Sequence, residues 1–415
     1  MTIRRISLAA GLVLAAVGCS NDDLITSPVP PYKGGAMFQR YVAMGNSITA
    51  GFQSGGINDS TQQQSYAVKL SAAMGGDKFY RPSLTIPGCP PPIDTLFTAS
   101  GTPHRLGGTA APPCSLRSAP LPPYISNVAV PGATSFDPFS RGPTVSSNAL
   151  TLLILGGRSQ VEAAAAARPT FVSAWIGNND VLGAAIDANN AGNPLEVTPV
   201  ALFESHYDSL LAGLDSIPTL QGRVLIGVAN VTLIPYFVKG SKFFNVKFGA
   251  DTIPGPPGAT KFPGNFLVNP NCASPQGDSI LVPFPRGAAV VAFARGNPAD
   301  TVGVDCADIH NISPAELVNL DTTVAAYNAF IASRATARGY AYVDPNALFA
   351  VLPAGAIPDF PNLPPLATAF TTPFGTYFTF DGIHPSNATH HLIAQVLVQT
   401  INATYGSAIP LAGVP

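Results

Sequence analysis

The stretch Tyr41-Val-Ala-Met-Gly-Asn-Ser47-Ile-Thr-Ala50 contains an apolar run, then a glycine and an asparagine, and then a serine. The apolar run predicts a buried strand, and Gly45-Asn46 predicts a turn at its end. Ser47 is therefore expected where the strand ends. Further apolar segments of similar length follow along the chain, and they predict a set of five buried strands. These strands are expected at residues 40–44, 125–130, 171–176, 224–229 and 341–343.

Segments with helical patterning separate most of the expected strands. In residues 199–217, for example, Phe203, Tyr207 and Leu210 recur at the spacing of one helix face. The expected helices cover residues 65–74, 158–167, 199–217, 314–338 and 387–405, the last with Ser386 as N-cap. This alternation predicts an α/β fold, a three-layer α/β/α sandwich around a central, mostly parallel five-stranded sheet. Ligands of such sheets bind beyond the carboxyl ends of the strands.

Three long stretches, residues 82–123, 239–309 and 352–376, are rich in glycine and proline and show little periodicity. Connections of that length inside a domain are usually functional loops or lids. We expect them to be insertions that wall an active-site cleft. The Phe, Leu and Pro residues of 352–380 could line an apolar acyl pocket or equally form a packed loop.

Four cysteines lie in the first two of these stretches, and an exported chain would meet an oxidising compartment. Their spacing suggests the pairs Cys89–Cys114 and Cys272–Cys306, although four cysteines allow three pairings. A metal site is the weaker interpretation, because no C-x-x-C or histidine pair flanks them. No metal or cofactor is expected.

The composition excludes some classes of function. Only 11% of the 415 residues are charged, the formal net charge is −2, and there is no run of Lys or Arg. The sequence therefore lacks the excess and clustering of basic residues that are typical of nucleic-acid-binding proteins. With 39 glycines and 42 prolines but 46% hydrophobic residues, the chain is expected to be loop-rich and folded.

The N-terminus has the pattern of a targeting segment. Arg4 and Arg5 precede a short apolar run, residues 6–18, which is too short to span a bilayer comfortably. The run Ala16-Val-Gly-Cys19-Ser20 resembles a bacterial lipobox. The resemblance implies a signal peptide over residues 1–18 and a lipidated Cys19. The prolines and the missing apolar periodicity that follow predict a flexible tether over 19–37, and a single domain is expected over 38–410. The lipobox resemblance also implies an exported protein anchored to the bacterial cell envelope, with Ser20 favouring the outer membrane. The alternative is an ordinary secretory signal in which Cys19 falls near the cleavage site.

Four short segments fall at or near the ends of expected elements, where a cleft would form. They are Gly45-Asn-Ser47-Ile, Val130-Pro-Gly132-Ala-Thr, Ile176-Gly-Asn-Asn179-Asp and Phe380-Asp381-Gly-Ile-His384-Pro. A serine attacks an ester at neutral pH only when a base takes its proton and an acid orients that base. The order and content of the segments resemble the GDSL, or SGNH, hydrolase family, and the resemblance covers residues 41–405 apart from the three insertions.

The resemblance implies a role for each residue. Ser47 would be the nucleophile, His384 the general base and Asp381 the acid that orients it. The N–H groups of Ser47 and Gly132 and the side-chain amide of Asn179 would form the oxyanion hole, which stabilises the negative charge of the transition state. The resemblance to this family also implies a flavodoxin-like sheet and the hydrolysis of carboxylic esters by an esterase or lipase.

One position departs from the family, which usually has aspartate where this chain has Asn46. The triad is unaffected, and Asn46 can still cap the following turn. An α/β-hydrolase fold is disfavoured, because its G-x-S-x-G motif requires glycine at the position of Thr49. Another alternative is a non-catalytic surface lipoprotein that uses the same fold to bind glycan or lipid.

The family does not fix the substrate, so acyl chains, acetylated glycans and phospholipids all remain open. The other histidines are expected to be surface or core residues without a catalytic role. They are His104, His206, His310, His390 and His391.

Overall fold

Four parallel strands form the central sheet among the described residues, in the order β1-β4-β5-β12. They are β1 (Tyr41–Gly45), β4 (Phe171–Trp175), β5 (Gly222–Ile226) and β12 (Ala341–Val343). Tyr41 pairs with Phe171 and Phe171 with Gly222, so the strands start in register. Every residue of the first three strands is buried, which agrees with continuous apolar strands covered on both faces.

This computed structural model describes residues 35–98, 102–108, 114–116, 122–140, 150–255, 258–363, 373–411 and 414, which belong to one compact unit, Lys33–Pro415. The signal peptide, Cys19 and most of the tether lie outside these residues. The structure does not test the predicted boundaries at residues 18 and 37. No helix in the described ranges is long and apolar enough to cross a membrane.

The predicted strand at 125–130 is not formed as a regular strand. It runs beside β1 with one parallel bridge, between Ala43 and Asn127. Val130 N donates to Gly45 O at 3.1 Å, but Gly45 N donates instead to the side-chain oxygen of Gln160 at 2.9 Å. The Gln160 amide thus occupies a position in the ladder that a fifth strand would use. The five-stranded, flavodoxin-like sheet is therefore not confirmed.

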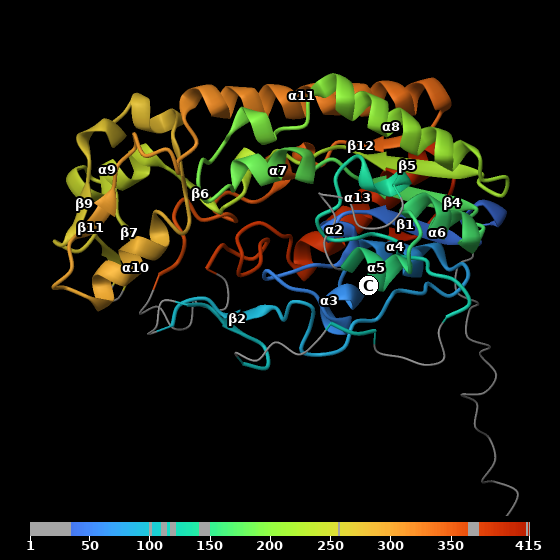
Figure 1. The fold of residues 1–415 in the computed structure, drawn as a ribbon, viewed down its shortest axis with the longest axis horizontal. Coiled ribbons are helices and arrows are strands. Elements are labelled where there is room, and N and C mark those ends of the chain that lie inside the picture. Colours follow the sequence, from blue (N-terminus) through green and yellow to red (C-terminus); the bar gives the residue numbers. More distant parts are fainter. Residues whose placement is uncertain are drawn as a thin grey trace, which may run out of the picture. The chain divides into compact units, whose positions relative to one another are not determined.

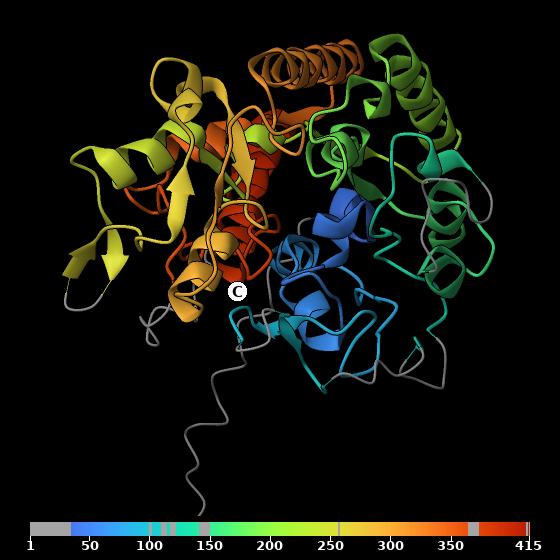
Figure 2. The ribbon, with the colours of Figure 1, turned by 60° about the vertical axis from the view of Figure 1, so that its left-hand side comes forward.

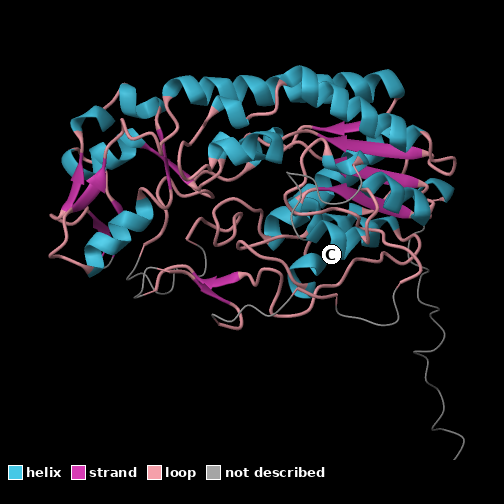
Figure 3. Cartoon of the chain, in the orientation of Figure 1, coloured by secondary structure: helices cyan, strands magenta, loops and turns pink. Residues whose placement is uncertain are grey.

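Helices cover both faces of the sheet (Figures 1 and 3). On one face, α4 (Tyr66–Met74) packs against α13 (Asn387–Tyr405). On the other, α8 (Val200–Asp215) packs against α6 (Gln160–Ala167) and α11 (Pro314–Arg338). These five helices match the predicted segments to within two residues at each end. Other short helices are α2 (Ser47–Ala50), α3 (Asp59–Gln63), α5 (Leu150–Leu155), α7 (Asn179–Ala185), α12 (Asn346–Val351), η2 (Ala36–Phe38), η3 (Asp137–Phe139), η4 (Pro194–Glu196) and η5 (Val231–Leu233).

The helix ends follow local sequence signals. Ser313 accepts a hydrogen bond from Glu316 N while the Glu316 side chain accepts one from Ser313 N, and this capping box starts α11. Gly339 ends the helix in the left-handed conformation. Ser386 caps α13 by accepting from Thr389 N, as predicted, and so fixes where the preceding loop stops.

The first two insertions contain more regular structure than their composition indicated. The first holds a hairpin of β2 (Ile93–Thr95) and β3 (His104–Arg105). The second holds two nine-residue helices and contributes to three short strand pairs, β6–β10, β7–β8 and β9–β11, of which β6 begins just before the insertion. Its elements are β6 (Phe237–Lys239), α9 (Gly240–Phe248), β7 (Ile253–Gly255), β8 (Gly258–Thr260), β9 (Phe266–Val268), η6 (Pro270–Cys272), η7 (Gln276–Ser279), β10 (Leu281–Pro283), α10 (Ala288–Gly296) and β11 (Val302–Val304).

The insertions have a core and crosslinks of their own. Disulfides join Cys89 to Cys114 and Cys272 to Cys306, the two pairs that the spacing suggested. Phe243 on α9 contacts Phe266 and Phe360, so aromatic rings connect the second insertion to the third. Phe360 and Phe374 are almost fully buried. The described part of residues 352–376 therefore packs as an ordered loop.

Candidate active site

Ser47 lies at the first position of α2, directly after β1, as the sequence predicts. Asn46 is the N-cap of this helix, and its side-chain oxygen accepts a hydrogen bond from Ile48 N at 3.1 Å. Gly45 has φ +149°, and a Cβ atom there would lie 2.2 Å from Trp175 O, so the turn requires glycine. Ser47 keeps 8% of its surface exposed, which leaves its hydroxyl at the edge of the sheet.

The loop before α13 brings His384 to Ser47 across 337 residues of sequence. His384 Nε2 lies 3.0 Å from Ser47 Oγ, and His384 Nδ1 lies 2.8 Å from Asp381 Oδ2. The ring of Phe52 lies beside the imidazole, with 4.8 Å between the ring centroids. The Nε2–Oγ and Nδ1–Oδ2 distances are within the range in which a nucleophile, a base and an orienting acid act together.

Asp381 is held as a carboxylate by several donors. Its Oδ2 accepts from Gly55 N at 2.6 Å, and its Oδ1 accepts from the backbone N–H groups of Ile383 and His384, each at 2.9 Å. Burial raises the pKa of Asp381, but the charge and hydrogen bonds of His384 and the Ile383 N–H outweigh it and lower that pKa to about 2. The carboxylate is therefore ionised at neutral pH and can stabilise an imidazolium.

Asn179 is hydrogen-bonded to the loop that carries Gly132. Gly132 has φ +85°, and neither its N–H nor that of Ser47 donates a hydrogen bond to another described residue. Asn179 Nδ2 donates to Ala133 O at 2.8 Å. An amide carries two hydrogens, so Asn179 retains one for a ligand. The oxyanion hole formed by Ser47, Gly132 and Asn179 stays a prediction, because no hydrogen bond among the described residues joins Gly132 or Asn179 to Ser47.

A second polar cluster supports the Gly132 loop, and sequence reasoning missed it. The carboxylate of Asp180 accepts from Ser135 N at 2.8 Å and from Ser135 Oγ at 2.6 Å, and Ser135 Oγ lies 3.0 Å from His206 Nδ1. Burial raises the pKa of Asp180 to about 6, although its bonds with Ser135 lower it. The adjacent Asn179-Asp180 pair is the only sequence signal. Both of its side chains anchor the loop that follows Gly132.

The remaining histidines lie in other surroundings. His104 pairs with Asp94 at 2.6 Å, and His310 pairs with Asp308. His390 is fully buried on α13, its Nδ1 accepts from Tyr66 N at 3.2 Å, and burial lowers its pKa to about 3. Of the histidines in the described ranges, only His384 is hydrogen-bonded to Ser47.

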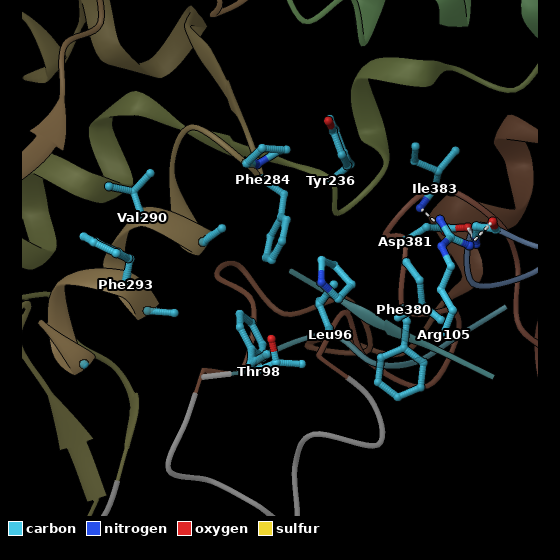
Figure 4. A pocket seen from close by; sticks show the side chains of 18 of the residues that line it. Leu96, Thr98, Arg105, Tyr236, Phe284, Val290, Phe293, Phe380, Asp381 and Ile383 are labelled. Atoms are coloured by element: carbon cyan, nitrogen blue, oxygen red, sulfur yellow. Dashed lines mark hydrogen bonds between the residues drawn. The ribbon is translucent and has the colours of Figure 1, made fainter. Parts of the chain in front are cut away.

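Two cavities flank the loop that carries His384. The larger, about 1040 Å³, begins at Gly55, Asp381 and Ile383 and extends between the β2–β3 hairpin and α10 (Figure 4). The smaller, about 80 Å³, is apolar and is lined by Ile48, Ile383 and Pro385 among others. Leu352, at the start of the third insertion, also lines the smaller cavity, so this insertion both packs as a loop and contributes to a pocket wall.

Both large insertions therefore line the cavity that begins at Asp381. Figures 1 and 2 show the β2–β3 hairpin and α10, from segments far apart in the sequence, on two sides of the red loop before α13. Neither Ser47 nor His384 lines the two cavities described above, so the expectation that the insertions wall the active-site cleft stays a prediction.

Comparison with known proteins gives distant structural matches only. No protein-family model matches the chain, and no curated protein does. Two solved structures of Axe2 from Geobacillus stearothermophilus are similar. One is described as an acetylxylan esterase, with 13% identity over 90% of this chain and 96% of that one. The other is a mutant described as an acetyl-xylooligosaccharide esterase, with 14% identity over 89% of this chain and 96% of that one. Both have a TM-score of 0.36, too low to carry an argument about function.

Proposed function

We propose that this protein is a serine hydrolase of the SGNH type that cleaves carboxylic esters. The observation that carries the proposal is the chain of two contacts, Ser47 Oγ to His384 Nε2 at 3.0 Å and His384 Nδ1 to Asp381 Oδ2 at 2.8 Å. The chain joins a serine, a histidine and a carboxylate in the order that nucleophilic catalysis needs.

In the proposed reaction, His384 Nε2 takes the Ser47 proton as Ser47 Oγ bonds to the ester carbonyl carbon. The N–H groups of Ser47 and Gly132 and the free amide hydrogen of Asn179 would stabilise the oxyanion. His384 then donates the proton to the alcohol oxygen as the C–O bond breaks, leaving an acyl group on Ser47. Water, activated by His384, hydrolyses that acyl group, releases the carboxylic acid and restores Ser47.

The test is the hydrolysis of short p-nitrophenyl esters by purified protein. Ser47→Ala should lower kcat by about 10⁶, as removal of a triad serine does elsewhere. Ser333→Ala is the matched control, because Ser333 is exposed on α11 and bonds only to Phe330 O among described residues. Activity that survives in Ser47→Ala would contradict the proposal. A folded wild-type protein that hydrolyses no ester would favour the binding-protein alternative.

The envelope anchor is a separate part of the proposal. We propose that Cys19 carries lipid and holds the enzyme at the bacterial cell envelope, at the outer membrane. The lipobox-like residues 16–20 support this. Cys19→Ala should then release an exported, soluble protein that retains its esterase activity, because the tether is separate from the triad. A variant that remains membrane-bound would contradict the anchor without affecting the assignment of the active site.

A further inference from the structure

Gly132 lies in a short turn that begins at the strand of the nucleophile. Ala133 N donates to Val130 O at 3.2 Å, and Gly132 between them has φ +85°, as the third residue of a type II turn requires. Val130 N donates to Gly45 O at 3.1 Å. Because Gly45 is two residues before Ser47, the first end of the turn is tied to the strand that ends at the nucleophile.

The start of α7 bonds both to the nucleophile turn and to the far end of the Gly132 turn. Asn46, the residue before Ser47, has its Nδ2 at 3.5 Å from the Oδ1 of Asn178. Asn179, the next residue along α7, donates from Nδ2 to Ala133 O at 2.8 Å. These two contacts relate the position of the turn to that of the nucleophile.

Asp180 makes the third contact from the start of α7, and it is the charged one. Ser135 N and Ser135 Oγ both donate to its carboxylate, at 2.8 and 2.6 Å. Hydrogen bonds to a carboxylate are about twice as strong as those between neutral groups. Asp180 and Ser135 are 1% and 0% exposed, so water does not replace these bonds when one partner is removed. The carboxylate therefore fixes the chain three residues after Gly132.

The charge of Asp180 does not serve stability at neutral pH. Burial raises the pKa of Asp180 to about 6, so the ionised carboxylate lowers the free energy of unfolding above that pH. Carboxyl groups with such perturbed pKa values are concentrated at functional sites. A role of Asp180 in placing the Gly132 turn accounts for a buried carboxylate that the triad does not use.

We propose, given the proposed ester hydrolysis, that Asp180 is a positioning residue that acts through Ser135 on Gly132. By fixing the end of the turn, Asp180 holds the Gly132 N–H where the oxyanion of the ester forms. Asp180 does not touch the substrate in this role. Loss of one oxyanion donor typically lowers the rate by about 10²–10³, and a misplacement of about 1 Å can cost about 10²-fold.

Three variants test the role of Asp180 in the hydrolysis of a short p-nitrophenyl ester. Asp180→Ala removes both acceptors and should lower kcat by about 10² with little change in KM. Asp180→Asn should restore kcat to within about threefold of the wild type, because its amide oxygen can accept from Ser135 N and its NH₂ can donate to Ser135 Oγ, which then donates to His206 Nδ1. Asp59→Ala is the matched control, since Asp59 is 4% exposed and pairs with Arg81 at 2.9 Å. It should lower stability and keep kcat.

Inhibition by n-butylboronic acid separates positioning from a purely structural role. The acid bonds to an activated serine as a tetrahedral adduct, and one of its oxygens would occupy the oxyanion position next to Gly132. In Asp180→Ala its Ki should rise by about the factor that kcat falls, while the Ki of butyrate should stay the same. Loss of stability alone moves neither constant at a temperature where the variant is folded. If Asp180→Ala does not fold, Ser135→Ala replaces it, because it removes one of the two bonds and should lower kcat by about tenfold.

The outcomes distinguish this inference from the proposed function. A folded wild-type protein that hydrolyses no ester would overturn both. An active wild type together with unchanged kcat and boronate Ki in folded Asp180→Ala, or in Ser135→Ala where that variant replaces it, would overturn the inference and leave the triad assignment intact. A loss in Asp180→Asn as large as that in Asp180→Ala would also overturn it, because the asparagine keeps the bonds to Ser135.

Discussion

The substitution Asp381→Asn tests the role of the carboxylate with little change of shape. Oδ1 of Asp381 accepts from two backbone N–H groups, and Oδ2 accepts from Gly55 N and faces His384 Nδ1. An asparagine whose oxygen keeps the Oδ1 bonds would direct its NH₂ at Gly55 N–H and His384 Nδ1. The imidazole then binds the amide through an unprotonated Nδ1, and its proton moves to Nε2, facing Ser47. That tautomer cannot accept the serine proton.

The expected cost follows from this change of tautomer. The analogous substitution in another serine hydrolase lowers kcat by about 10⁴, equivalent to about 5 kcal/mol of transition-state stabilisation. We expect a loss of this order for Asp381→Asn with KM largely retained. Asp381→Ala should also leave more residual activity than Ser47→Ala, because Asp381 only orients and stabilises the base.

The assay is steady-state hydrolysis of a short p-nitrophenyl ester at pH 7, with thermal unfolding monitored to confirm the fold. Asp208→Asn is the matched control, since Asp208 pairs with Arg334 on the outer helices, far from the triad in sequence. Its kcat should equal that of the wild type. An Asp381→Asn variant that is folded and within tenfold of wild-type kcat would refute the reasoning.

Three further predictions concern stability. The folded-state pKa of Asp381 is about 2, against the usual 3.8. The ionised carboxylate therefore adds about 2 kcal/mol to the free energy of unfolding above pH 4, and this contribution is lost as the pH falls toward 2. Urea unfolding of wild type and Asp381→Asn at pH 5 and pH 2.5 should show their difference shrinking, and a constant difference would contradict this. Asp180 has the opposite effect on stability. Because its folded-state pKa is about 6, the free energy of unfolding should fall by up to about 3 kcal/mol as the pH rises from 4 to 6. Asp180→Asn should remove that fall, and a variant whose unfolding keeps the wild-type pH profile would contradict this role of Asp180. Gly45→Ala should cost at least about 2 kcal/mol in urea unfolding, because its Cβ would lie 2.2 Å from Trp175 O. Gly183→Ala, on α7 with open space around it, should gain about 0.5–1 kcal/mol, and equal effects at the two glycines would contradict the close contact.

Sequence reasoning succeeds where the signal is local. The apolar run before Ser47, the N-cap Ser386 and the three-residue spacing of Asp381 and His384 each determine a short piece of backbone. Because strand ends gather at one edge of a parallel sheet, these local pieces also predict that Ser47 and His384 meet.

The features that were missed depend on contacts between distant segments. Gln160 replaces a ladder bond of Gly45 from 115 residues away, and no local pattern distinguishes such a glutamine from a helix-surface residue. Asp180 holds Ser135 across 45 residues. The α9 and α10 helices have nine residues each, which is too short for a clear helical periodicity, and Phe243 on α9 contacts Phe360 of the third insertion. The large cavity likewise exists only where two insertions meet.

The central claim is that Ser47 is a nucleophile activated by His384. Labelling with a fluorophosphonate probe, followed by peptide mass spectrometry, tests it directly, because the probe bonds only to an activated serine. The account predicts a single adduct on Ser47, its loss in Ser47→Ala, and labelling at least 10³-fold slower in His384→Ala. His310→Ala, the control at a histidine paired with Asp308, should label at the wild-type rate. An adduct on another serine, or rapid labelling of Ser47 without His384, would contradict the claim.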